Sequence, residues 1–256
     1  SGAQAPKASQ TRLSALTMSW LHRFFGSNKT ERQASLSPEH SQAIEAWQQL
    51  PAEDLNRAHN RCRYVVVDVE SSGLDMRKDR LISIGAVALV HGKIDFKDAF
   101  QVVLRQDKAS SHENILIHGI GGMAQREGMD PAEALIAFLR YIGKSPLVAY
   151  HAFFDQALIE KAMHEYLGME LGQTWIDLAW VLPSFFQFQT DARMELDDWL
   201  ETFGIDSFLR HNAVSDAYAT ARLLQLAIAA GNQKGSDSPA SFLEIEKARR
   251  WMHERR

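Results

Sequence analysis

The chain has a single cysteine and no long hydrophobic run. Cys62 cannot form an internal disulfide and has no neighbours at metal-ligand spacing, which excludes a cysteine-based zinc site. No stretch approaches the roughly 20 apolar residues that a membrane-spanning helix needs, and the N-terminal segment lacks the hydrophobic core of a signal peptide. We therefore expect a soluble, cytoplasmic protein that does not contact membranes.

The chain also lacks an excess of positive charge, since its formal net charge is −4, and its composition is otherwise that of a globular protein. Residues 1–38 hold five Lys and Arg against one acid, and the other 218 residues hold 23 against 31. This acidic surplus argues weakly against a nucleic-acid partner. Divalent cations bound to clustered carboxylates would offset part of it.

The pattern along the chain divides it into three segments. Residues 1–60 are expected to form an N-terminal tail and helical appendage, with a short amphipathic turn at 18–25 and a helix over 39–50. Residues 61–230 form the main domain. Residues 231–256 combine a Gly- and Ser-containing linker at 231–239, expected to be flexible, with a C-terminal helix over 240–256.

The main domain begins with strand patterns and continues with helical ones. The β-branched run 64–69 predicts a buried central strand, and 81–90 and 94–104 predict two more, joined as an antiparallel meander. Asp130-Pro131 predicts a helix start, because Asp caps and Pro suits the first helical position. A strand at 146–150 and helices at 152–167, 177–182, 195–203 and 212–229 follow. This order predicts an α/β fold, a mixed sheet flanked by helices.

Two acids stand at the end of the first strand. Asp68 and Glu70 are two residues apart, so their side chains leave the same face of the strand. A carboxylate at the end of an apolar strand is costly unless it is paired or binds a cation, and no Lys or Arg follows before Arg77. These two acids alone leave open a metal site or a plain solvent-exposed strand end. Gly73 favours the former, because it allows backbone amides to approach a phosphate.

Three motifs then carry a resemblance to a known family. DVESSGLD at 68–75 resembles the first motif of the DnaQ-like (DEDDh) 3′–5′ exonucleases, named for the proofreading epsilon subunit of bacterial DNA polymerase III. LVAYHAFFD at 147–155 resembles the second motif, and HNAVSD at 211–216 matches the third, His-x(4)-Asp. The resemblance covers about 63–230 and implies a ribonuclease H-like fold.

The resemblance also implies a reaction and its residues. It implies a 3′–5′ exonuclease that releases nucleoside 5′-monophosphates from DNA with a free 3′ end, single-stranded by preference, using two Mg²⁺ or Mn²⁺ ions. The metal ligands it implies are Asp68, which bridges both ions, Glu70, Asp155 and Asp216. His211 is the implied general base, suited to proton transfer near neutral pH. The implied substrate-binding residues are Ser71, Ser72, Gly73, Leu74, Glu113, His118 and Phe154.

Several alternatives stay open. Taken singly, Asp155 is typical of a helix start and His118 of a satisfied loop histidine. Tyr150-His151 stands where the family usually has His-Asn, and Ser71-Ser72 where Thr-Thr is commoner.

The motifs fit an RNA exonuclease of the RNase T or oligoribonuclease type equally well, and a non-catalytic binding module is a third reading. The tails could contact a polymerase or another protein, and the basic segment 247–256 with Trp251 suits either a solvated helix end or single-strand binding.

Overall fold

The computed structural model describes residues 36–186, 194–206 and 211–255. The turn expected at 18–25 lies outside these residues. No helix in the described ranges is both long and apolar enough to cross a lipid bilayer.

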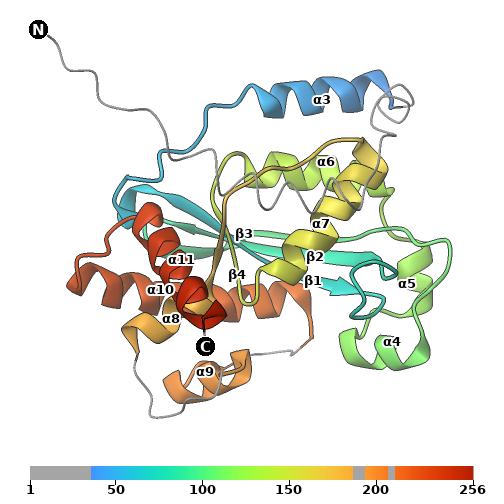
Figure 1. Ribbon diagram of the computed structural model, residues 1–256. Helices are drawn as coiled ribbons and strands as arrows, with labels where there is room; N and C mark the ends of the chain where they lie inside the picture. The colour runs from blue at the N-terminus through green and yellow to red at the C-terminus, as the bar shows by residue number, and fades with distance from the viewer. Residues whose placement is uncertain (1–35, 187–193, 207–210, 256) are drawn as a thin grey trace, which may run out of the picture.

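A five-stranded mixed sheet forms the centre of the molecule (Figure 1). Its strands are β1 (Arg63–Ser71), β2 (Leu81–Val90), β3 (Lys93–Val103), β4 (Leu147–Ala149) and β5 (Trp175–Asp177), in the order β3-β2-β1-β4-β5. β1 pairs antiparallel with β2, and β2 with β3, while β1, β4 and β5 run parallel. The expected antiparallel meander and mixed sheet are confirmed.

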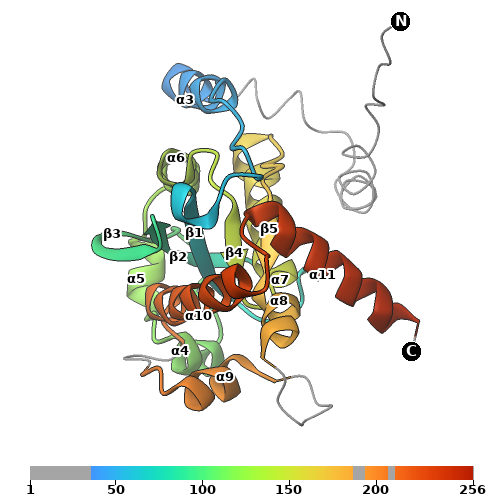
Figure 2. The ribbon, with the colours of Figure 1, turned by 90° about the vertical axis from the view of Figure 1, so that its left-hand side faces the viewer.

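Helices cover both faces of the sheet, because β1 is apolar on both sides. Val65, Val67 and Val69 pack with α3 (Pro38–Gln48), α6 (Pro131–Ile142) and α7 (Phe153–Ala162). Tyr64 and Val66 pack on the opposite face. That face is covered by α8 (Leu178–Phe185), α9 (Leu196–Phe203), α10 (Ala213–Gln233) and α11 (Pro239–Glu254). Figure 2 shows the sheet between these two helical layers.

Most of the predicted helices form where their start and stop residues stand. Asp130 caps α6 by accepting a hydrogen bond from the amide of Ala132, as its sequence predicts. α7 continues into a π-helical turn, Met163–Leu167, and ends at Gly168, whose φ of 61° is left-handed. Gly204 ends α9 in the same way. Two short helices, α4 (His112–His118) and α5 (Gly122–Arg126), and the strand β5 were not predicted.

The segment 231–239, expected to be a linker, is helical at both ends, in α10 and α11. Residues 231–233 continue α10, and a Cβ on Gly231 would lie 2.9 Å from the ring of Phe242 and 3.3 Å from that of Phe185. The next residues are tied to His59, whose backbone amide donates to Asp237 O and whose Nε2 lies 3.2 Å from Ser236 O. Close packing therefore fixes a segment whose composition is typical of a linker.

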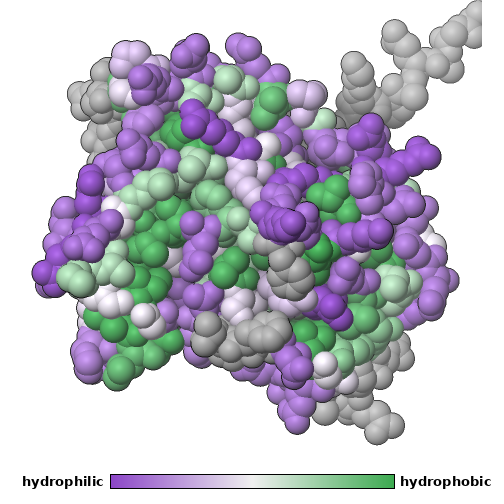
Figure 3. Space-filling view, turned by 180° about the vertical axis from the view of Figure 1, so that it is seen from behind, coloured by the Kyte–Doolittle hydropathy of each residue, from purple (hydrophilic) through white to green (hydrophobic). Residues whose placement is uncertain are grey.

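Exposed apolar residues gather at α4 and α5. Leu116 is 72% exposed, Ile117 56% and Met123 72%. Figure 3 shows hydrophobic residues on the left-hand side of its view, the side of the molecule on which α4 and α5 lie. These helices stand beside the loop that follows β1, so this apolar surface borders the candidate site.

Candidate active site

Two carboxylates near the C-terminal end of β1 lie on the face of the sheet that α10 covers. Asp68 and Glu70 alternate with Val67 and Val69, whose side chains pack on the α6 and α7 side. β4 ends at Ala149, so the last residues of β1 have no strand partner on that edge. The amide of Val69 instead donates to Asp155 Oδ1, at 3.1 Å. This hydrogen bond joins the first two motifs.

Asp155 occupies the first turn of α7 and is 5% exposed. Burial raises the pKa of its carboxyl well above the usual value, and repulsion from Asp177 and Glu70 raises it further, against hydrogen bonds from the backbone amides. An ionised Asp155 is therefore costly here unless a cation lies nearby. The surrounding donors are carboxylate oxygens, which suit hard divalent cations such as Mg²⁺ and Mn²⁺.

Gly85 brings the third motif to the same end of the sheet. It pairs with Asp68 across the β1–β2 ladder. A Cβ on Gly85 would lie 2.2 Å from the carbonyl carbon of Ala213 and 2.2 Å from the amide nitrogen of Val214, so α10 starts directly against β2. The first turn of α10 holds Asp216, which is 5% exposed and accepts a 3.0 Å hydrogen bond from the amide of His211.

Two histidines at this site have left-handed backbones. The φ of His211 is 60° and that of His151 is also 60°, a conformation that residues other than glycine seldom adopt and that concentrates at functional sites. His211 is exposed. His151 is half-buried, its amide donates to Asp177 Oδ1 at 3.0 Å, and its Nε2 lies 3.8 Å from Glu195 Oε2.

A carboxylate that the sequence reasoning missed closes the loop after β1. Asp79 Oδ1 accepts from the Ser72 hydroxyl at 2.8 Å, and Asp79 Oδ2 from the amide of Asp75 at 2.8 Å. A Cβ on Gly73 would lie 2.5 Å from this carboxylate, so a larger residue there would displace the Asp79 side chain. The Ser71 hydroxyl donates to Gly73 O at 2.6 Å. The serine hydroxyls therefore hold the loop in shape.

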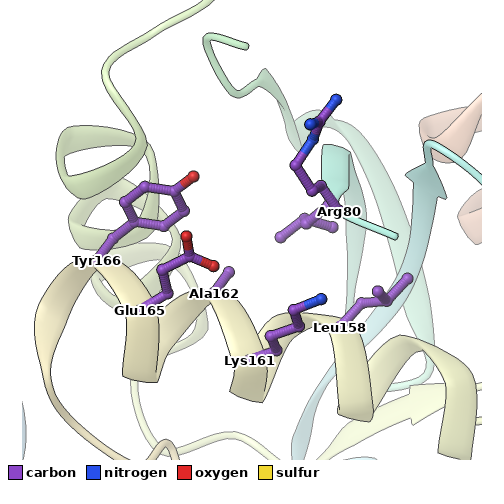
Figure 4. A pocket seen from close by; sticks show the side chains of 7 residues that line it. Arg80, Leu158, Lys161, Ala162, Glu165 and Tyr166 are labelled. Carbon is purple, nitrogen blue, oxygen red and sulfur yellow. The ribbon is translucent and has the colours of Figure 1, made fainter. Parts of the chain in front are cut away.

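Lys161 attaches the same loop to α7. Its Nζ donates to the carbonyl oxygens of Arg77 at 2.9 Å and Asp79 at 2.7 Å, and lies 3.4 Å from that of Met76. Figure 4 shows Lys161 on α7 beside a small pocket, with Glu165 and Tyr166 from the π-helical turn and Arg80 on the opposite side. No local sequence signal marks this lysine, because its partners are more than 80 residues away.

The remaining predicted residues lie around the loop in different settings. The amide group of Asn114 donates to Ser72 O and joins α4 to the loop. His118 is buried, with Nδ1 accepting from the amide of Ile120 and Nε2 at 3.2 Å from the Ser110 hydroxyl, and burial lowers its pKa. Leu74 is 87% exposed and Glu113 is exposed.

Phe153 and Phe154, the two aromatic residues at the start of α7, differ in burial. Phe154 packs against the core beneath α7, whereas the neighbouring Phe153 is 46% exposed. Phe153 is therefore the more exposed of these two rings. Consecutive helical residues point about 100° apart, so a sequence alone does not say which of two adjacent rings is exposed.

The five motif residues lie at one end of the sheet, but their side chains are not arranged as a complete set of metal ligands. These residues are Asp68, Glu70, Asp155, His211 and Asp216. In residues 36–186, 194–206 and 211–255, no three His, Cys, Asp or Glu side chains converge as a ready-made coordination shell. The donor types and the buried Asp155 carboxylate nevertheless fit a divalent cation. The end of β1 and the starts of α7 and α10 each carry the acid or acids of one of the three motifs, all at the carboxyl end of β1.

Comparison with known sequences gives an independent result. A family model described as RNase_T, exonuclease, matches residues 65–224. The epsilon subunit of DNA polymerase III from Rickettsia typhi is 29% identical over 208 residues, covering 73% of this chain and 87% of that protein. The PolC-type DNA polymerase III of Thermotoga petrophila is 28% identical over 160 residues, covering 62% of this chain. The chain spans only 11% of the length of that PolC-type polymerase.

Solved structures share the fold. Escherichia coli exonuclease I in complex with a dT13 oligonucleotide has a TM-score of 0.56 at 17% identity, covering 67% of this chain and 42% of that one. Exonuclease X in complex with 5′ overhanging duplex DNA has a TM-score of 0.56 at 20% identity, covering 72% and 99%. The family model matches more than half of the chain, so the protein belongs to the RNase_T exonuclease family.

Proposed function

We propose that this protein is a metal-dependent 3′–5′ exonuclease that removes nucleoside 5′-monophosphates from single-stranded DNA. One observation carries the proposal: the ends of β1, α7 and α10 meet, joined by the hydrogen bond from Val69 to Asp155 and by the close approach of α10 to Gly85. This meeting gathers carboxylates from all three family motifs. Family membership supports a nuclease, and the polarity and the preferred strand are our proposal.

Four carboxylates would hold two divalent cations, and these are Asp68, Glu70, Asp155 and Asp216. When bound, such ions neutralise the phosphate, acidify a water molecule and stabilise the departing 3′ oxygen. Asp155 is buried and is repelled by Glu70, and a bound cation would relieve this repulsion.

His211 would accept the proton of the attacking water. Its side chain is exposed, so water reaches it, and its backbone is fixed beside Asp216 by the 3.0 Å hydrogen bond to that carboxylate. The loop Ser71–Leu74 would hold the terminal nucleotide, with its shape set by the Asp79 carboxylate. The terminal nucleotide would also contact Leu74, which is 87% exposed, and the helix α4 through Glu113 and His118.

The choice of DNA rests on relatives. The similar proteins are named as DNA polymerase III polypeptides, and two of the similar structures contain DNA. A free 3′ end of single-stranded DNA is therefore the substrate we propose. Association with a polymerase and a cytoplasmic location are proposals on the same ground.

A digestion assay tests this function. DNA and RNA oligonucleotides of the same sequence, labelled at the 5′ end, are incubated with the protein in Mg²⁺, Mn²⁺ or EDTA. We expect the labelled DNA to shorten stepwise from its 3′ end with either metal, and no change in EDTA. His211→Ala should lower turnover on the order of 10²-fold or more, and His40→Ala, on the distant helix α3, should not.

The other outcomes of this assay assign the alternatives. Stepwise shortening of RNA alone would identify an RNA exonuclease. Digestion of neither polymer by the folded protein would contradict the proposed activity and favour a non-catalytic binding module.

A further inference from the structure

The C-terminal helix α11 is joined to the active-site end of the sheet by a ring of polar side chains. Arg250 Nη2 donates to Asp177 Oδ2 at 3.0 Å, and Arg250 Nε donates to Glu246 Oε1 at 2.9 Å. Glu246 Oε2 accepts from the backbone amide of Asp177, also at 2.9 Å. The Arg250 guanidinium in addition lies 5.0 Å from the ring centre of Trp180 on α8. Two residues of α11 therefore bind both the main chain and the side chain of Asp177.

Asp177 connects this ring to the turn that precedes α7. It is the last residue of β5 and the cap of α8, and it is 2% exposed. Its Oδ1, the oxygen not bound to Arg250, accepts from the amide of Ala179 at 3.1 Å and from the amide of His151 at 3.0 Å. His151 lies in the turn between β4 and α7, in the left-handed conformation.

The turn is also held by main-chain bonds, from the amide of Phe154 to His151 O at 3.2 Å and from the amide of Gln156 to Ala152 O at 2.9 Å. The residue that precedes α7, Ala152, has no side chain able to cap the helix, so the first turn of α7 lacks a side-chain cap. Asp155 is in that first turn. The hydrogen bond that the amide of His151 donates to Asp177 is thus a side-chain restraint on the backbone four residues before Asp155.

Arg250 supplies the positive charge beside two acids, the buried Asp177 and the largely buried Glu246. The side chain of Asp177 is 3% exposed and that of Glu246 is 14% exposed, while that of Arg250 is 39% exposed. Removing one partner from a buried ion pair leaves an uncompensated charge, which the structure relieves by moving or protonating a side chain. Either change would weaken the hold of Asp177 on His151.

We propose that Arg250 is a positioning residue for the exonuclease site, acting through Asp177 on the turn at His151 and so on Asp155. The expected loss of activity rests on the proposed function, whereas the expected loosening of the turn at His151 rests only on the hydrogen-bond ring. It gives α11, which projects from the domain in Figure 2, a role in catalysis without contact with substrate. A small displacement of a catalytic group lowers the rate on the order of 10²-fold.

The test compares Arg250→Gln and Arg250→Lys with a matched control. Lys247→Gln removes a positive charge from the same helix, at an exposed pair with Glu244 of 3.9 Å. Backbone amide hydrogen exchange is measured for 147–158, with 131–142 in α6 as the internal reference, alongside kcat and KM on single-stranded DNA.

We expect Arg250→Gln to speed exchange in 147–158 but not in 131–142, and to lower kcat about tenfold or more with little change in KM. Arg250→Lys keeps the charge but cannot bind both acids through a planar fork, so it should restore part of the lost rate. Lys247→Gln should match the wild type in both measurements.

Equal exchange in 147–158 for Arg250→Gln and Lys247→Gln would overturn the inference. So would an Arg250→Gln variant whose exchange is faster by the same factor in 147–158 and in 131–142. Exchange does not depend on activity. A wild-type protein that digests nothing would therefore contradict the proposed function while the exchange result still decides the role of Arg250.

Discussion

Gly85 on β2 lies directly opposite Asp68 on β1, and its missing side chain is what allows α10 to begin beside that acid. The glycine carries no chemistry. It determines how closely the third motif approaches the first, because any Cβ would overlap the backbone at Ala213 and Val214.

Gly85→Ala should damage stability and activity together. The added methyl would lie 2.2 Å from backbone atoms of α10, so the helix has to move away from the sheet. We expect the free energy of unfolding to fall by about 1–3 kcal/mol and exonuclease turnover to fall as well. Urea denaturation and digestion assays measure the two effects. Gly121→Ala is the control, since a Cβ there meets no atom within 4 Å; equal effects of both variants would contradict the packing argument.

Lys161→Met should loosen the loop after β1. The methionine keeps the aliphatic stem but loses the hydrogen bonds to the carbonyl oxygens of Arg77 and Asp79. We expect KM for single-stranded DNA to rise severalfold, with a smaller change in kcat, because the loop is proposed to hold the terminal nucleotide. Steady-state kinetics measures both constants. Lys78→Met removes a lysine of the same loop whose side chain is 84% exposed, and an equal rise in KM there would show that charge alone matters.

The buried His59 should make stability depend on pH. Burial lowers its pKa, against weaker opposing effects of Ser236 O and Asp237. The unfolded chain binds a proton near pH 6.5 and the folded one only at lower pH, so the free energy of unfolding falls as pH drops below about 6.5. The slope for one such group is at most about 1.4 kcal/mol per pH unit.

Urea denaturation of His59→Gln across this range should give a shallower slope than the wild type. Some slope should remain, since burial lowers the pKa of His118 in the same direction. His112→Gln, at an exposed position, serves as the control. An unchanged slope in His59→Gln would rule out His59 as its source.

Asp155→Asn should separate stability from activity. The amide oxygen can still accept from Val69, while the buried charge beside Asp177 and Glu70 disappears. We expect the metal-free variant to be about 1–2 kcal/mol more stable than the wild type at neutral pH and inactive on DNA. Thermal unfolding with and without Mg²⁺ measures this. Loss of stability in the metal-free variant would contradict the idea that the charge at Asp155 is costly.

The sequence predicts the fold well where the signal is local. The run of valines before Asp68 predicts β1, and Asp130-Pro131 predicts the start of α6, because a strand pattern and a helix cap act over a few residues. The three motifs lie at one end of the sheet, and the roles of their residues are our proposal.

Other features depend on contacts between distant residues. β5 has three residues, too few for a strand pattern, and forms because it pairs with β4. The segment 231–239 has the composition of a linker, yet its path is fixed by Phe242 and His59. The bonds of Lys161 to the loop and of Arg250 to Asp177 span more than 70 residues each, so no local pattern predicts them.

The central claim is that the acids of the three motifs bind divalent cations, and calorimetric titration with Mn²⁺ tests it most directly. The wild type and Asp68→Ala are compared, after circular dichroism has shown that both are folded. We predict that the wild type binds Mn²⁺ and that Asp68→Ala loses most of this affinity, since Asp68 is expected to contact both ions. Equal Mn²⁺ affinity in the two proteins would contradict the account.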